Sequence, residues 1–251
     1  MEISKYEKLD FSNIFYKKYR EFTPILNEYF SRMKVDMNLT DKELDNKIRL
    51  MLQNVHNVKF GIMPKTLKGY FRPDKHRIVF NANLFNKDYN YEELFNIITH
   101  ELDHACSYDI KNKRFGLYRY DENSKNNFNN KDIFFDELRT DLGSTRRVFN
   151  DNYVDDDKMI RHTYAYKNFS SFSTVLQNCL GINEVEFLKL ADKGRSFFDK
   201  KMESKFENPK DYQIFMEKFA INSSYMLNLK SGRIDATPKF DTCKYKKLCN
   251  Y

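Results

Sequence analysis

The 251-residue sequence predicts an α+β fold, with a small sheet in the first half and mostly helices in the second. Three short runs rich in β-branched and aromatic residues lie between residues 57 and 81, separated by turn-forming residues. Directly after them, residues 90–110 contain neither Gly nor Pro, and their apolar residues recur at helical spacing. We therefore expect a sheet that packs against one buried helix.

Residues 1–56 are predicted to form an N-terminal helical segment, with helices over 5–34 and 40–56. The second helix begins at Thr40, and Glu43 follows three residues later. This spacing is typical of a capping box, in which each side chain accepts a hydrogen bond from the other residue's backbone.

Three strands are predicted next, over residues 57–63, 69–72 and 77–81. The turn-forming run Pro73–His76 separates the second strand from the third. We expect residues 57–170 to form the central domain of the chain. It would combine these strands with the two helices that contain the motifs described below.

The predicted buried helix contains the sequence HExxH at residues 100–104, after a candidate cap at Asn90 with Glu93 three residues later. Because His100 and His104 are four residues apart, both imidazoles lie on one helix face and can reach a single tetrahedral zinc ion. Glu101 would project toward the open coordination position and accept a proton from a bound water. The alternative is that both histidines have ordinary structural roles.

A zinc site of this kind needs a third protein ligand, and a second predicted helix over residues 132–142 offers a pair of carboxylates on one face. Glu137 and Asp141 are four residues apart on it, and Glu137 follows His104 by 33 residues. The intervening stretch Lys111–Lys131 is polar and rich in Asn and Lys, so we expect a surface loop there. The alternative is that both carboxylates lie on a solvated helix face.

The order HExxH and then ExxxD resembles the gluzincin metallopeptidases of the thermolysin-like clan, and it implies a zincin-like fold. By this resemblance, His100, His104 and Glu137 hold one zinc ion per chain and Glu101 is the catalytic base. Asp141 would accept a hydrogen bond from His100 and fix its tautomer. Alternatively, Asp141 is itself the third ligand, as in an aspzincin-like site. The chain lacks the glycine and third histidine of a metzincin.

A weaker resemblance connects residues 57–142 with bacterial and phage metallopeptidases that clear repressors. It depends on the runs Ile78–Asn81 and Ile98–Glu101. In zincins, the strand before the active helix lies at the edge of the active-site cleft, where an extended peptide can pair with its free backbone groups. By resemblance, we assign the Arg77–Asn81 strand to this edge.

Peptide hydrolysis also needs a donor for the oxyanion, and gluzincins often supply a Tyr or His that follows the third ligand. His162 is our candidate, ahead of Tyr164 and Tyr166 in the same segment. Tyr118 and Tyr120 in the predicted loop could also supply this donor.

The rest of the chain is predicted to be a helical lobe over residues 171–230 and an irregular tail over residues 231–251. In the lobe, one helix is expected to begin at Asn183 and another after Asn208, with Pro209 in the first helical position.

Composition indicates the cellular setting. The chain has no apolar run that could span a bilayer and no apolar signal core at its N-terminus, so we predict a cytoplasmic protein, with export by a non-classical route left open. The net charge of +7 is interpreted as a solvated basic surface rather than a nucleic-acid site. Cys106 is expected to pack in the core. Cys243 and Cys249 are expected to be free thiols, with a disulfide between them as the alternative.

Together these features predict a zinc-dependent endopeptidase that acts on a peptide or protein substrate. One alternative is a zinc-containing regulatory or binding module without turnover. A second is a basic helical protein that binds nucleic acid or a protein partner.

Overall fold

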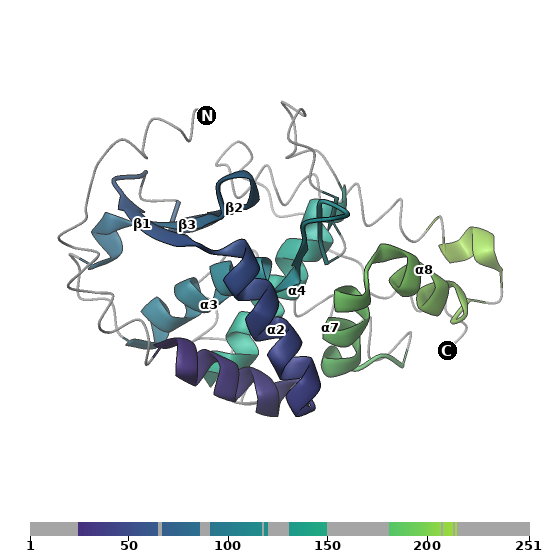
Figure 1. The fold of residues 1–251 in the computed structure, drawn as a ribbon. Coiled ribbons are helices and arrows are strands. Elements are labelled where there is room, and N and C mark those ends of the chain that lie inside the picture. The colour runs from purple at the N-terminus through teal and green to yellow at the C-terminus, as the bar shows by residue number, and fades with distance from the viewer. Residues whose placement is uncertain are drawn as a thin grey trace. The chain divides into compact units, whose positions relative to one another are not determined.

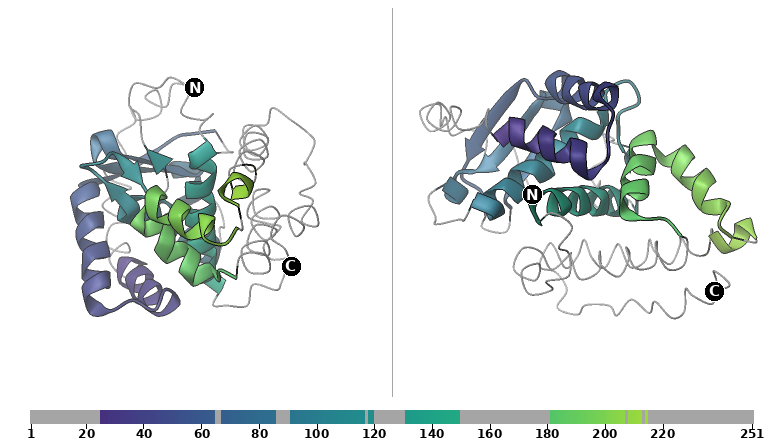
Figure 2. Two further views of the ribbon diagram at one scale, coloured as in Figure 1. Left: turned by 90° about the vertical axis from the view of Figure 1, so that its right-hand side faces the viewer. Right: turned by 90° about the horizontal axis from the view of Figure 1, so that it is seen from below.

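The computed structural model describes residues 25–64, 67–85, 91–116, 118–119, 131–149, 181–206, 208–212 and 214. Its helices and small sheets make the protein α+β, as predicted (Figures 1 and 2). The chain divides into two compact units, Met1–Asn112 with Gly143–Asp151, and Lys113–Leu142 with Asn152–Tyr251. The four-segment division expected from the sequence stays a prediction.

Two helices open the described part of the first unit. The first covers residues 25–36, and residues 5–24 of the predicted helix lie outside the described ranges. The second, α2, runs from Asp41 to Asn54. The Thr40 hydroxyl accepts from the backbone N–H of Glu43 at 3.3 Å, and the Glu43 carboxylate accepts from the N–H of Thr40 at 2.8 Å. The predicted capping box is therefore confirmed.

The main sheet has the strand order β1-β3-β2, with β1 at Asn57–Gly61, β2 at Gly69–Arg72 and β3 at Arg77–Asn81. Strand β3 pairs in parallel with β1 and antiparallel with β2, so it is the central strand. The prediction that it is an edge strand with free backbone groups for a peptide is therefore wrong. The last four residues of β3 are buried, as expected for a strand covered on both faces.

Helix α3 spans Tyr91–Ser107 and packs against β2 and α2. The predicted cap Asn90 lies outside the described residues. Several apolar side chains of α3 are almost fully buried: Phe95, Ile98, Leu102, Ala105 and Cys106. Between β2 and β3, the short 3-10 helix η2 at Pro73–Lys75 closes the turn, and a second one, η3 at Ala82–Phe85, follows β3. The helix expected to carry the HExxH motif is thus present and largely buried.

The chain after α3 is more structured than the predicted loop. Strands β4 at Tyr108–Asp109, β5 at Arg114–Phe115 and β6 at Tyr118–Arg119 form a small sheet in this order, and β5 and β6 are antiparallel. Residues 120–130 lie outside the described ranges. Helix α4 follows at Lys131–Phe149, longer at its C-terminal end than the predicted 132–142.

In the second unit, α7 at Glu184–Lys193 and α8 at Arg195–Glu203 pack together. Their contact includes Phe187 and Phe198, whose rings meet edge-on with centroids 5.9 Å apart. The Asn183 side chain accepts from the N–H of Glu186 at 2.8 Å, which confirms the predicted helix start. Helical residues follow from position 209, also as predicted.

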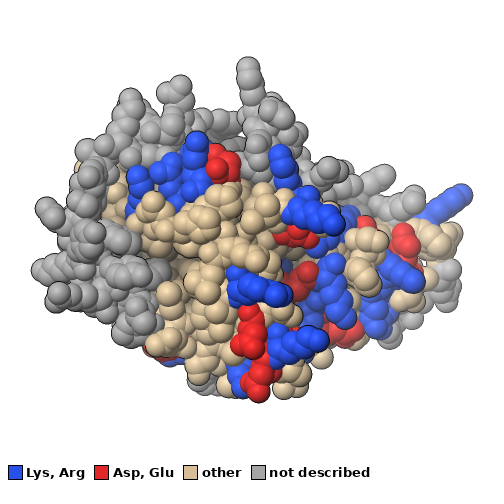
Figure 3. Space-filling model, viewed as in Figure 1, with Lys and Arg blue, Asp and Glu red and all other residues tan. Residues whose placement is uncertain are grey.

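Charged side chains of both signs lie next to each other on the face in Figure 3, over α2 and around α8. Ion pairs of this kind in the second unit are Arg195–Asp199 at 2.7 Å and Lys201–Glu186 at 3.3 Å. None of the described helices is both long and apolar enough to cross a bilayer.

The side chain of Asn54 joins α2 to the end of α3, which gives a first prediction. It is fully buried, and its amide donates to the carbonyl oxygens of Ala105 and Tyr108, each at 2.8 Å. Asn54→Ala leaves two buried carbonyls without this donor, so we expect the free energy of unfolding to fall by about 2 kcal/mol. Urea denaturation measures this. The exposed neighbour Gln53 is the control, and Gln53→Ala should change stability by less than about 0.5 kcal/mol. Equal effects would contradict the role of Asn54.

Candidate metal centre

Two imidazoles project from one face of α3. His100 and His104 are one helical turn apart, and their ring centroids lie 5.0 Å apart with an angle of 81° between the ring planes. Both histidines are less buried than Thr99, Leu102 and Ala105, which lie between and beside them on the helix. The histidines thus lie on the less buried side of a helix whose other side faces the core.

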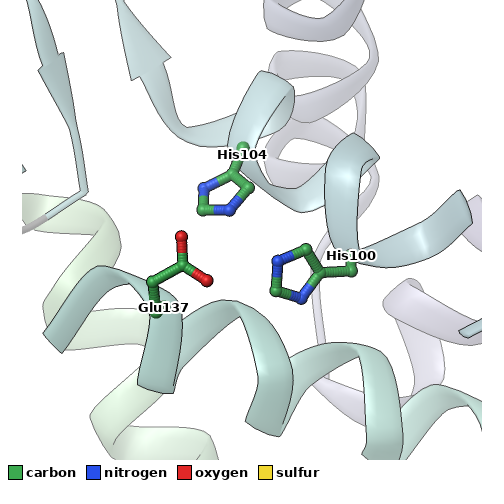
Figure 4. A group of neighbouring side chains, drawn as sticks. All are labelled: His100, His104 and Glu137. Atoms are coloured by element: carbon green, nitrogen blue, oxygen red, sulfur yellow. The ribbon is translucent and has the colours of Figure 1, made fainter. Parts of the chain in front are cut away.

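The carboxylate of Glu137 on α4 completes a group with these histidines. One ligand atom from each of the three residues lies within 4.8 Å of the other two, and Figure 4 shows the side chains pointing toward one another. In a tetrahedral zinc site, bonds of about 2.0–2.2 Å place neighbouring ligand atoms about 3.4 Å apart. Small side-chain rotations would close the remaining difference. Two imidazoles and one carboxylate therefore fit a transition metal such as zinc.

The turn of α4 that carries Glu137 is held by its own buried contacts. Arg139 and Asp136 form an ion pair at 3.1 Å, and both side chains are almost fully buried. Gly116, between β5 and β6, has a φ of 41°, which favours glycine. A Cβ at Gly116 would lie 3.0 Å from Asp136 Oδ1 and 3.0 Å from Arg139 Nε. The β5–β6 turn therefore packs closely against the residues that flank Glu137.

Glu101, the expected base, is buried against the backbone of β2. Its side chain is 6% exposed. A Cβ built on Gly69 would lie 3.1 Å from Glu101 Cγ and 3.3 Å from Glu101 Oε1. The sequence indicated Gly69 only as the start of a strand, and the structure shows that a residue without a side chain leaves space for Glu101 there.

Asp141 lies one turn after Glu137 on α4 and is 7% exposed. The alternative of a solvated helix face therefore does not describe this residue. Its expected hydrogen bond to His100 stays a proposal.

The structure describes only some of the other residues that the sequence analysis named. Cys106 is buried, as expected, and does not form a disulfide. Strand β6 contains Tyr118, although its side chain is not among those described. The remaining oxyanion candidates and the two C-terminal cysteines lie outside the described residues: Tyr120, His162, Tyr164, Tyr166, Cys243 and Cys249.

Comparison with known proteins gives one partial similarity. A protein of Locusta migratoria named "Endothelin-converting enzyme homolog" is 28% identical to this chain over 98 residues. The match covers 36% of this chain and 13% of that protein, so the chain spans about an eighth of its relative's length. No family model matches the chain. No solved structure matches it either.

Metal binding is the first test of this centre. We expect purified protein without a histidine tag to bind about one zinc ion per chain, measured by elemental analysis and by competition with a chromophoric chelator. His104→Ala and Glu137→Ala should each lower zinc affinity by more than about 100-fold, because loss of a ligand exceeds the usual effect of an outer-shell change.

The matched control is His56→Ala, which removes an exposed histidine outside the group and should leave zinc affinity unchanged. Full zinc occupancy in Glu137→Ala would instead assign the third ligand to Asp141 or another residue.

Proposed function

We propose that this protein is a zinc-dependent peptidase that cleaves internal bonds of a peptide or protein substrate in the cytoplasm. The observation that carries the proposal is the convergence of His100, His104 and Glu137, with Glu101 next to His100 on the same helix. The partial similarity to a protein named as an endothelin-converting enzyme homolog supports a peptidase. The order of HExxH and ExxxD supports a gluzincin-type site on a zincin-like fold.

Each residue of the candidate metal centre would have its own role in metal binding or catalysis. His100, His104 and Glu137 would hold the metal. When bound, zinc lowers the pKa of a coordinated water toward neutrality and polarises the substrate carbonyl. Asp141 would hold His100 in the tautomer that leaves its other nitrogen as a ligand. His162 remains our candidate for the donor to the oxyanion.

Glu101 would be the group that moves the proton. Its carboxylate would take a proton from the attacking water and deliver it to the nitrogen of the departing amine. The position of its side chain against Gly69 supports this role, because close packing against β2 restricts the rotamers of a base and keeps its orientation fixed.

Substitution of Glu101 separates catalysis from metal binding. We expect Glu101→Gln to keep zinc and to lower kcat for a mixed peptide library by about 10²–10⁴-fold, because the amide cannot accept the proton. Cleavage can be followed by mass spectrometry with zinc content measured on the same samples. Glu92→Gln, an exposed glutamate at the start of α3, is the control and should keep full activity.

An unchanged rate in Glu101→Gln would remove this residue from the mechanism. A wild-type protein that binds zinc and cleaves nothing in the library would favour the non-catalytic binding module.

The close approach of Gly69 to Glu101 predicts a graded loss of activity. Gly69→Ala introduces a Cβ that meets Glu101 Cγ and Phe80 Cδ1, each at 3.1 Å, and Gly69→Val adds two more methyl groups. We expect kcat to fall by about 10-fold in the alanine variant and by about 100-fold in the valine variant, since misplacement of about 1 Å is costly. Zinc affinity should stay within about 3-fold of wild type, because Glu101 is not a ligand. Equal activity in all three proteins would show that Glu101 tolerates displacement.

A further inference from the structure

The HExxH segment contains a second buried carboxylate that the proposed chemistry does not use. Asp103 is 3% exposed and lies one residue before His104 on α3. Its Oδ2 accepts a hydrogen bond from Arg147 on α4, and its Oδ1 accepts one from the hydroxyl of Tyr29 on the first described helix. Both oxygens of one carboxylate therefore join α3 to two other helices.

The partners of Asp103 are themselves buried. Arg147 is among the largest fully buried side chains of the described residues, and its guanidinium lies over the ring of Tyr29, 5.3 Å from the centroid. Burial raises the pKa of Tyr29 well above its usual value, so the hydroxyl stays protonated and remains a donor. The charge of Asp103 is thus offset by Arg147, and both of its oxygens have a donor. The group Tyr29, Asp103 and Arg147 is called here the helix clamp.

A glycine in the middle of α4 leaves room for the helix clamp. A Cβ at Gly143 would lie 2.8 Å from Arg147 Nη2 and 2.8 Å from Asp103 Oδ2. Glycine is less favoured inside a helix than any residue except proline. Its presence within the 19-residue helix α4 is explained by the path that Arg147 needs to reach Asp103.

The C-terminal end of α4 is also fixed along its axis. Arg32 Nη1 donates to the carbonyl oxygens of Arg147 at 2.7 Å and Val148 at 3.2 Å, which are among those that a helix end leaves without a partner. Arg146 pairs with Asp36 at 2.6 Å. The helix over residues 25–36 thus holds α4 by its last turn.

We propose that the helix clamp is a positioning device for the metal ligand Glu137. This inference rests on the proposed metal centre. Glu137 precedes Arg147 by ten residues on one continuous helix, about 15 Å along its axis. A shift of α4 by one residue relative to α3 would turn Glu137 by about 100° away from the histidines. The ion pair between Asp103 and Arg147 opposes this shift, because the shift would separate the two charges, and it would also break the pair of the neighbouring Arg146 with Asp36.

The test is a double-mutant cycle on zinc affinity. Arg147→Met keeps much of the length and bulk of the side chain and removes its charge. We expect it to lower the zinc affinity of the full-length protein by about 10- to 100-fold, the range found for residues that orient ligands. In a Glu137→Ala background, the same substitution should lower affinity by less than about 3-fold, because the ligand that it positions is already absent.

Two further variants keep the test decisive. Gly143→Ala perturbs the helix clamp by one methyl group and should show the same coupling to Glu137 if Arg147→Met does not fold, as judged by circular dichroism. Arg49→Met removes an exposed arginine of α2 and should leave zinc affinity unchanged.

A lower melting temperature with unchanged zinc affinity would overturn the positioning role and leave only a structural one. Equal losses of affinity in the wild-type and Glu137→Ala backgrounds would overturn it as well. A wild-type protein that binds no zinc would instead refute the proposed metal centre, and this inference with it.

Discussion

The buried ion pair between Asp103 and Arg147 is the constraint on which the arrangement of α3 and α4 depends. A charge removed from water is stable only when a partner and hydrogen bonds replace its hydration, and here Tyr29 supplies the remaining donor. Loss of one partner from such a pair typically costs about 3–5 kcal/mol. The pair joins residues 44 positions apart, and the bond from Tyr29 joins residues 74 positions apart. These contacts therefore connect segments that are distant in the sequence and favour one register of the helices.

Side chains of the HExxH motif on α3 point toward different parts of the structure. Successive side chains turn by about 100°, so Glu101 and Asp103 point in directions about 200° apart. Glu101 packs against Gly69 of β2, and Asp103 reaches Arg147. The histidines between these two directions meet Glu137. A substitution inside HExxH therefore affects either the proposed chemistry or the helix packing, depending on which residue is changed.

Local features of the fold were predictable from the sequence, and non-local ones were not. The capping box at Thr40 and the helix start at Asn183 depend on residues three positions apart, and the sequence predicts both. The central position of β3 depends on which strands pair with it, and the run Arg77–Asn81 does not contain that information. The ion pair of Asp103 was missed for the same reason. Gly143 directly follows the predicted helix over residues 132–142, and only the structure shows that its missing side chain leaves space for Arg147 and Asp103.

The proposed metal centre depends both on local sequence spacing and on the packing of segments that are distant in the sequence. The spacing of His100 and His104 follows from the helical repeat wherever α3 forms, so the sequence alone can predict how two of the three proposed ligands lie relative to each other. The position of Glu137 depends on how α4 packs against α3, and the helix clamp joins these two helices through a buried ion pair. An ion held by both helices would bind the folded chain and not the unfolded one, so its binding would add to the stability of the same register. The metal and the helix clamp would then favour one arrangement of α3 and α4 by two separate contacts, one through ligands and the other through a buried ion pair.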